Sequence, residues 1–264
     1  MTDVDDLVKN PVTRRAFMSR MTSAGLGLAA ASLLGKSTFA SGKPVLELVN
    51  VPDNGHMPGI PGRTKNEQVL NYALSLEILE ADLYRQALNL AAGKDILAPL
   101  PENVSGYQLV LPDGGIGTPN AARGFLYLQQ FAAVEAAHRD FLRVAIQSMG
   151  GTPVEPNPGG YQAPFGTDLF SILTVIRTVE ETGVRAYLGA AQFISGFKLT
   201  QAAAAIYTTE ARHSAAINYV LGKDAGPQKH RLDSQAVFHQ YGENNFEYFQ
   251  TPEQILHAVK PFLA

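Results

Sequence analysis

Residues 210–213 read Glu-Ala-Arg-His, and the same spacing of glutamate and histidine occurs at 135–138, which read Glu-Ala-Ala-His. On an α-helix, residues three positions apart lie on one face, one turn from each other. Each pair therefore presents a carboxylate and an imidazole side by side, which is half of the ligand set of a dinuclear metal site. Two further helices would each have to supply one inward-facing carboxylate to complete such a site.

Glu77 and Glu180 are the candidates for these two carboxylates. Each is followed seven residues later by a tyrosine, Tyr84 or Tyr187, so the chain reads twice as Glu-x6-Tyr and then Glu-x2-His. This shared spacing favours Glu77 and Glu180 over the two glutamates that compete with them, Glu80 and Glu181. The pattern indicates an internal duplication of function.

Four segments have the pattern of helices, and glycine, proline and capping residues set their ends. The first contains no proline or glycine, carries an apolar stripe around Glu77 and ends before Gly93. Asn120 is the expected cap of the second helix, and Thr167 or Asp168 that of the third. We predict helices over 65–92, 120–149, 168–195 and 199–221.

The midpoints of these helices fall near residues 78, 134, 181 and 210, at or beside the four glutamates. Helices packed side by side meet at their middles whichever way they run. All six ligands are therefore expected at one level of an all-α four-helix bundle spanning 65–221.

The remaining segments are connections and ends. An extended lead-in, 41–64, contains a candidate edge strand at 45–49. The proline- and glycine-rich connection 94–119 contains a candidate strand at 107–111 and is expected to fold over one end of the bundle. The linker 150–167 is long enough to cross the bundle. In the C-terminal extension 222–264, Thr251 starts a predicted short helix that ends at Ala258.

The first forty residues resemble an export signal. Residues 13–18, Thr-Arg-Arg-Ala-Phe-Met, are similar to the bacterial twin-arginine motif, and the apolar stretch 24–34 is shorter than the roughly 20 residues of a membrane span. Thr38-Phe39-Ala40 fits cleavage after Ala40. We expect export to the periplasm or beyond by the twin-arginine route; an uncleaved anchor or a helix built into the fold is the alternative.

Composition excludes several functional classes. The 264 residues are 45% hydrophobic and 17% charged, which suits a soluble globular core. No cysteine is present, so disulfides, thiolate ligands and cysteine nucleophiles are excluded. The net charge of −3 becomes −5 without residues 1–40, with 16 basic and 21 acidic side chains remaining. The chain therefore lacks the basic character of a nucleic-acid-binding protein.

Four carboxylates and two imidazoles suit Fe or Mn, and would also accept Zn or Co. Their charge of −4 matches two divalent ions, and without metal it would destabilise a dry core. Tyr84 and Tyr187 are expected to be core residues with satisfied hydroxyls, with hydrogen bonding to ligands or electron donation as the alternatives. Arg212 is either solvated or paired with a carboxylate. The remaining histidines are expected at the surface: His56, His230, His239 and His257.

These motifs resemble the ferritin-like superfamily of di-iron and di-manganese carboxylate proteins over about 65–221. Residues 76–80 with Tyr84, and residues 180–189, are similar to an exported branch that includes desiccation-related proteins. The absence of cysteine rules out the rubredoxin module of rubrerythrins, and the 94–119 segment is unlike the connection in a cage-forming iron store. The resemblance implies the metal ligands Glu77, Glu135, His138, Glu180, Glu210 and His213.

Two functions from different classes follow. The first is an exported Fe or Mn metalloprotein that oxidises ferrous iron or scavenges peroxide or oxygen; a manganese catalase is one form of it. The second is a non-catalytic stress or desiccation protein whose metal site is structural or vestigial. Metal ions and small oxidants are the expected partners, no membrane span is expected after signal cleavage, and a homo-oligomer is compatible with either function.

Overall fold

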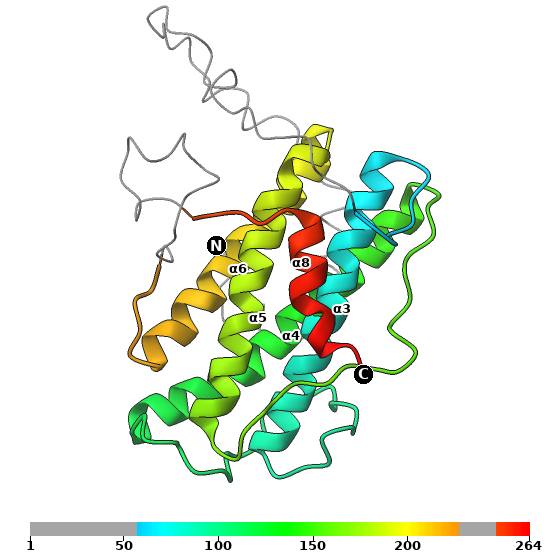
Figure 1. The fold of residues 1–264 in the computed structure, drawn as a ribbon. Coiled ribbons are helices and arrows are strands. Elements are labelled where there is room, and N and C mark those ends of the chain that lie inside the picture. Colours follow the sequence, from blue (N-terminus) through cyan, green and yellow to red (C-terminus); the bar gives the residue numbers. More distant parts are fainter. Residues whose placement is uncertain (1–56, 227–246) are drawn as a thin grey trace, which may run out of the picture. The chain divides into compact units, whose positions relative to one another are not determined.

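The structure is a computed structural model that describes residues 57–226 and 247–264. Four long helices form its body: α3 (Lys65–Ala91), α4 (Thr118–Ser148), α5 (Leu169–Ala190) and α6 (Phe197–Val220) (Figure 1). The described residues contain no strand, only an isolated antiparallel bridge between Tyr161 and Leu263. The predicted all-α fold is confirmed. The signal at 1–40, the strand at 45–49 and most of the lead-in lie outside the described residues.

The linker after α4 crosses the length of the bundle, as its length predicts. It starts beside the first turn of α3, where the Thr152 N–H donates to Glu67 Oε1 at 3.0 Å. It then reaches the last third of α3, where Gln86 Nε2 donates to the Tyr161 carbonyl at 2.9 Å. Consequently α5 starts at the end of the bundle where α3 finishes. Helices α3 and α4 form one antiparallel pair, and α5 and α6 form the other (Figure 1).

Three predicted helix boundaries differ from the structure: the starts of α4 and α6, each preceded by a glycine, and the end of α5. Helix α4 begins at Thr118 because Gly117, at φ +83°, precedes it and Pro119 suits the first turn. Asn120 is therefore no cap; its Nδ2 donates to the Ile116 carbonyl at 3.1 Å. Helix α5 ends at Ala190, before the predicted Ser195, and the 3₁₀ turn η2 (Ala191–Phe193) follows.

The start of α5 matches the prediction. Asp168 is its N-cap, and Asp168 Oδ1 accepts from the Ser171 N–H at 2.8 Å. Helix α6 begins at Phe197, two residues before the predicted start, directly after Gly196, whose φ of +95° is a conformation that favours glycine.

The 94–119 connection packs against the end of α3 and forms no strand at 107–111. The Val110 N–H donates instead to the Ala91 carbonyl at 3.0 Å, one of the free carbonyls at the end of a helix. Its apolar side chains, among them Val104 and Leu109, lie against the core. The segment covers one end of the bundle, as predicted, but through helix-end and side-chain contacts.

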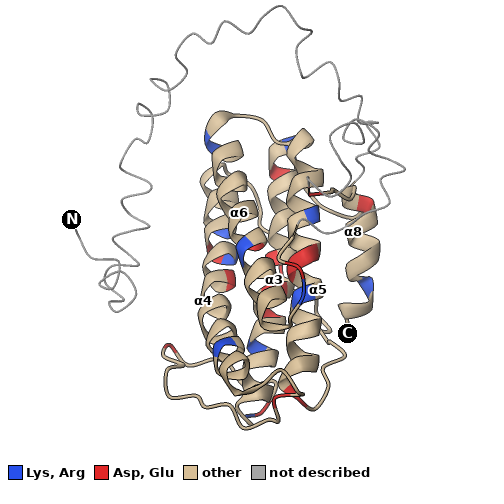
Figure 2. Ribbon diagram, turned by 90° about the vertical axis from the view of Figure 1, so that its left-hand side faces the viewer, with Lys and Arg blue, Asp and Glu red and all other residues tan. Residues whose placement is uncertain are grey.

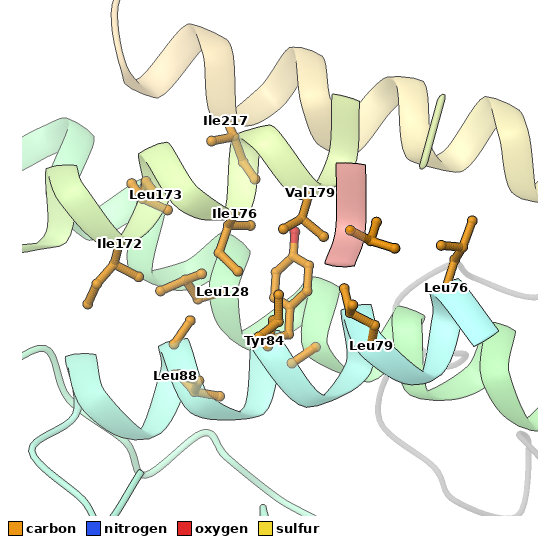
Figure 3. Packing of buried hydrophobic residues seen from close by; sticks show 14 of the residues in the cluster. Leu76, Leu79, Tyr84, Leu88, Leu128, Ile172, Leu173, Ile176, Val179 and Ile217 are labelled. Carbon is orange, nitrogen blue, oxygen red and sulfur yellow. The ribbon is translucent and has the colours of Figure 1, made fainter. Parts of the chain in front are cut away.

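Two apolar clusters fill the bundle. Leu88, Leu128 and Ile172 belong to the larger one, which joins all four helices (Figure 3). Leu74 and Ile146 belong to the smaller one, nearer the start of α3. Each of these side chains is fully buried, which stabilises the fold by about 1.5–3 kcal/mol per residue. The middle turns of the helices lie between these groups of residues.

The C-terminal extension contributes to the core. Helix α8 (Pro252–Val259) has a capping box between Thr251 and Gln254, which confirms the predicted start. Ile255 and Val259 of α8 are buried against the bundle, and α8 packs on α5 (Figure 1). Gly189 of α5 allows a close approach here, because an added Cβ would lie 1.8 Å from the Gln250 carbonyl oxygen.

Among the described helices, none combines the length and hydrophobicity of a membrane span.

Candidate metal centre

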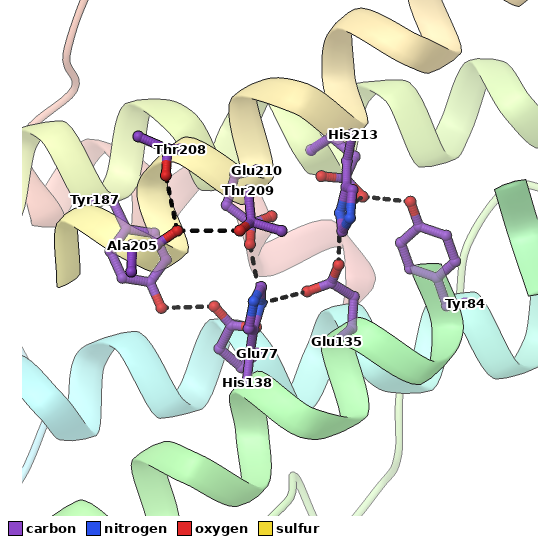
Figure 4. Close-up of polar contacts among 11 residues, drawn as sticks. Glu77, Tyr84, Glu135, His138, Tyr187, Ala205, Thr208, Thr209, Glu210 and His213 are labelled. Carbon is purple, nitrogen blue, oxygen red and sulfur yellow. Dashed lines mark hydrogen bonds and ion pairs between the residues drawn. The ribbon is translucent and has the colours of Figure 1, made fainter. Parts of the chain in front are cut away.

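The six predicted ligands meet at the middle of the bundle. Helices α3 and α5 each contribute one glutamate, and α4 and α6 each contribute a Glu-x-x-His pair. Figure 2 shows acidic positions close together at mid-length of α3 and α5. The four glutamates are at most 1% exposed, and both histidines have largely buried side chains. The structure therefore brings together Glu77, Glu135, His138, Glu180, Glu210 and His213 (Figure 4).

Their potential ligand atoms form two overlapping groups of four. One group contains Glu77 and His138, and the other contains Glu180 and His213; within each group the atoms lie within 4.8 Å of one another. Both groups include the two glutamates of the Glu-x-x-His pairs, Glu135 and Glu210. This is the arrangement expected of two adjacent centres joined by two shared carboxylates.

Glu135 lies between the two histidines. Its Oε2 is 3.0 Å from His138 Nδ1, and its Oε1 is 2.8 Å from His213 Nδ1. His138 Nδ1 also lies 3.1 Å from Glu210 Oε1 and 3.4 Å from Glu77 Oε2. The same nitrogen, Nδ1, thus faces the carboxylates on both sides of the site.

The donor atoms are better placed to bind divalent cations than to form hydrogen bonds with one another. Within the described part of the chain, five buried carboxylate oxygens of these glutamates and His213 Nδ1 have no hydrogen-bond partner of acceptable geometry. A buried, unpaired carboxylate is costly, and buried charges are normally paired or coordinate metals. Oxygen and imidazole donors suit Fe, Mn or Zn. The residues present therefore fit divalent metal ions.

The protonation of the site reflects this crowding. Burial raises the pKa of Glu77 to about 7, even though the adjacent His138 lowers it. Burial and the neighbouring Glu135 raise the pKa of Glu210 well above its usual range. For Glu135, burial opposes the charge, but the hydrogen-bonded His138 and the adjacent His213 outweigh it and lower the pKa to about 2. Burial also disfavours charge on His213, yet Glu180 and Glu135 raise its pKa to about 9. Protons thus occupy the metal-free site near neutral pH.

The two tyrosines form hydrogen bonds between α3 and α5. Tyr187 donates to Glu77 Oε1 at 2.6 Å, and Tyr84 donates to Glu180 Oε1 (Figure 4). In the repeated Glu-x6-Tyr spacing, Tyr84 shares α3 with Glu77 and Tyr187 shares α5 with Glu180. Each tyrosine nevertheless donates to the glutamate on the other helix. Burial raises the pKa of both phenols well above their usual range, so each remains a neutral hydrogen-bond donor. Their hydroxyls are satisfied by the proposed ligands themselves.

The competing glutamates have different surroundings. Glu181 accepts hydrogen bonds from Ser214 and Asn218 and lies 3.7 Å from Arg185, so its charge is compensated away from the centre. Glu80 is also buried, at 3% exposure, and burial together with Glu210 raises its pKa.

The sequence did not predict that Glu80 lies beside the proposed ligands. A Cβ added at Gly183 of α5 would lie 3.0 Å from Glu80 Oε1 and 3.4 Å from Glu210 Oε2. Gly183 therefore provides the space in which this fifth carboxylate lies. The available signal was the position of Glu80, one turn after Glu77 on the same apolar helix.

The other predicted residues lie outside the centre or outside the described part of the chain. Arg212 and His257 are exposed, as a solvated residue and a surface histidine should be. Phe131 of α4 stacks on the His213 ring with centroids 3.8 Å apart, a contact that the sequence did not reveal. The other surface histidines predicted, outside the described residues, are His56, His230 and His239.

A four-helix bundle with one long crossover and this ligand set defines the class of dinuclear carboxylate proteins. Residues 65–223 match the family described as "Ferritin-like domain", and the chain belongs to that family. A search of curated proteins gives no significant match. The family match confirms the predicted superfamily and covers all six residues of the centre.

Proposed function

We propose that this protein is an exported ferritin-like metalloprotein that binds two Fe or Mn ions and uses them in redox chemistry with dioxygen or peroxide during stress. One observation carries the proposal: two groups of buried donor atoms share Glu135 and Glu210. The ferritin-like family supports the same assignment. Export by the twin-arginine signal at 1–40 and a role in desiccation or other stress rest on the sequence resemblance.

Each residue has a defined role in this proposal. Glu77 and His138 hold one ion, and Glu180 and His213 hold the other. Glu135 would be shared by the two ions, because its two oxygens face different histidines, and Glu210, which belongs to both groups, would be shared as well. The residues assigned as ligands are those predicted from the sequence.

When bound, two such ions supply two one-electron changes. With iron, the site would supply the two electrons that reduce dioxygen to hydrogen peroxide, with two protons taken up. The chain provides the surroundings for this step. Apolar clusters on either side limit access of water, and Tyr84 and Tyr187 each hold one oxygen of a ligand glutamate. Orienting partners of this kind typically change metal affinity about 10–100-fold.

The test compares the wild type with Glu135→Ala, using Asp140→Ala as the matched control. Asp140 lies on the same helix, five residues further on, and its side chain is 61% exposed. Wild type and control should bind about two Fe or Mn ions per chain and consume ferrous iron or peroxide, and Glu135→Ala should lose both properties. Retained metal and turnover in Glu135→Ala would refute the ligand assignment. Metal binding without turnover in the wild type would instead support a structural site.

A further inference from the structure

A row of stacked rings joins the surface of α4 to the proposed metal centre. Phe131 stacks on the His213 ring, with centroids 3.8 Å apart and planes 20° apart. Tyr127 stacks in turn on Phe131, with centroids 5.1 Å apart and planes 6° apart. His213 Nδ1 lies 2.8 Å from Glu135 Oε1, so the row ends among the proposed ligands.

Helical spacing produces this row. Tyr127, Phe131 and Glu135 follow one another at intervals of four residues, which places them on one face of α4. The eight residues from Tyr127 to Glu135 span about 12 Å along the helix. Tyr127 is partly exposed, whereas His213 is only 4% exposed. The three rings therefore lead from the surface to a buried ligand.

The row serves only one half of the centre. His138 is the counterpart of His213 in the other Glu-x-x-His pair, yet none of the described rings stacks on it. Stacked aromatic pairs also stabilise protein interiors. Packing alone, however, does not require a continuous row from a partly exposed phenol to a metal ligand.

Tyr127 is the residue of this row that is suited to one-electron chemistry. The chain contains no tryptophan and no cysteine, so its phenols are the side chains most readily oxidised by a single electron. Overlapping π systems couple neighbouring rings electronically, and a phenol near the surface can release its proton to water. Tyr84, by contrast, is fully buried, donates its hydrogen bond to Glu180, and meets Phe131 edge-on at 6.4 Å and 75°.

We propose that Tyr127, Phe131 and His213 form the route by which electrons from an external reductant enter the peroxide-oxidised centre. Tyr127 gives one electron through the two rings and one proton to water, and becomes a phenoxyl radical. A small enediol reductant such as ascorbate then returns a hydrogen atom and restores the phenol. Reduction of hydrogen peroxide to two water molecules consumes two electrons and two protons, so two such passages balance one turnover. The inference rests on the proposed redox function and specifies where its reductant acts.

The first measurement detects the radical directly. Metal-loaded protein is mixed with hydrogen peroxide, frozen at intervals and examined by EPR. A tyrosyl signal should form in the wild type and be lost in Tyr127→Phe, a variant that keeps the ring and its packing. In Phe131→Leu, which removes the middle ring, the signal should form at least tenfold more slowly. Tyr219→Phe is the matched control and should match the wild type, because Tyr219 is 66% exposed on α6 and lies outside the row.

The second measurement concerns the reductant. Ascorbate added before peroxide should abolish the tyrosyl signal in the wild type. It should also be consumed at least several-fold faster by the wild type and Tyr219→Phe than by Tyr127→Phe, with equal metal content in all three proteins. Equal rates of ascorbate consumption would show that electrons enter elsewhere and would overturn the route.

The oxidation state of the metal, followed by absorption spectroscopy, separates this inference from the proposed function. Metal that peroxide leaves unchanged would overturn both proposals. Metal that is oxidised without a tyrosyl radical in the wild type, or with an undiminished radical in Tyr127→Phe, would overturn the electron route alone.

Discussion

Replacing Glu77 by glutamine should stabilise the metal-free protein while weakening its metal site. Burial raises the pKa of Glu77 from 4.5 to about 7. For an acid whose pKa is raised on folding, the folded state binds more protons than the unfolded state between these two values. The free energy of unfolding therefore falls as pH rises through this window. At about 1.4 kcal/mol per pH unit, ionised Glu77 costs the fold on the order of 3 kcal/mol above pH 7.

The amide of Glu77→Gln resembles the protonated acid and carries no such cost. Thermal unfolding in a chelator should show the variant more stable than the wild type by roughly 3 kcal/mol at about pH 8.5, a rise in Tm of about 6–12 °C for a domain of this size. At about pH 5 the gain should be under about 1 kcal/mol. Glu181→Gln is the control, because Glu181 is already hydrogen-bonded by Ser214 and Asn218 and should gain nothing. A gain for Glu77→Gln that is absent, or equal at both pH values, would refute the reasoning.

Three further predictions concern the centre and its support. Tyr84→Phe removes the hydrogen bond to Glu180 and should weaken binding of the metal ion that Glu180 holds about 10–100-fold in a calorimetric titration. Equal affinities of the variant and the wild type would contradict this role of Tyr84. Glu180 and Glu135 outweigh the opposing effect of burial and raise the pKa of His213 to about 9, so a proton must leave before metal binds. Metal affinity measured against a competing chelator should therefore rise between about pH 6.5 and 9, and a flat profile would count against this role of His213. Gly189→Ala places a Cβ 1.8 Å from the Gln250 carbonyl oxygen and should lower stability by about 1–3 kcal/mol in urea, where an unchanged midpoint would show that α8 is not docked there.

The position of the site along the bundle was predictable because nearby glycine and cap residues set the helix ends. Gly93, Asp168 and Gly222 stop or start helices for reasons that act within a few residues, so the helix midpoints followed without knowledge of the topology. The errors at Asn120 and Ser195 moved individual ends only slightly. Each of the four glutamates therefore stayed within one turn of the middle of its helix.

Contacts between helices were less predictable. The repeat pairs Glu77 with Tyr84 along one helix, whereas the hydrogen bond of Tyr84 crosses to Glu180. That exchange depends on how closely α3 and α5 approach, and linear spacing carries no such information. The burial of Glu80 likewise depends on the missing side chain of Gly183, about a hundred residues away in the chain.

Metal content, measured by mass spectrometry on protein folded and exported by its own cells, tests the central claim most directly. The account predicts close to two equivalents of Fe or Mn per chain, because four buried carboxylates and two histidines form two overlapping sets of donors. A stably folded protein with far less than one equivalent of metal would contradict it.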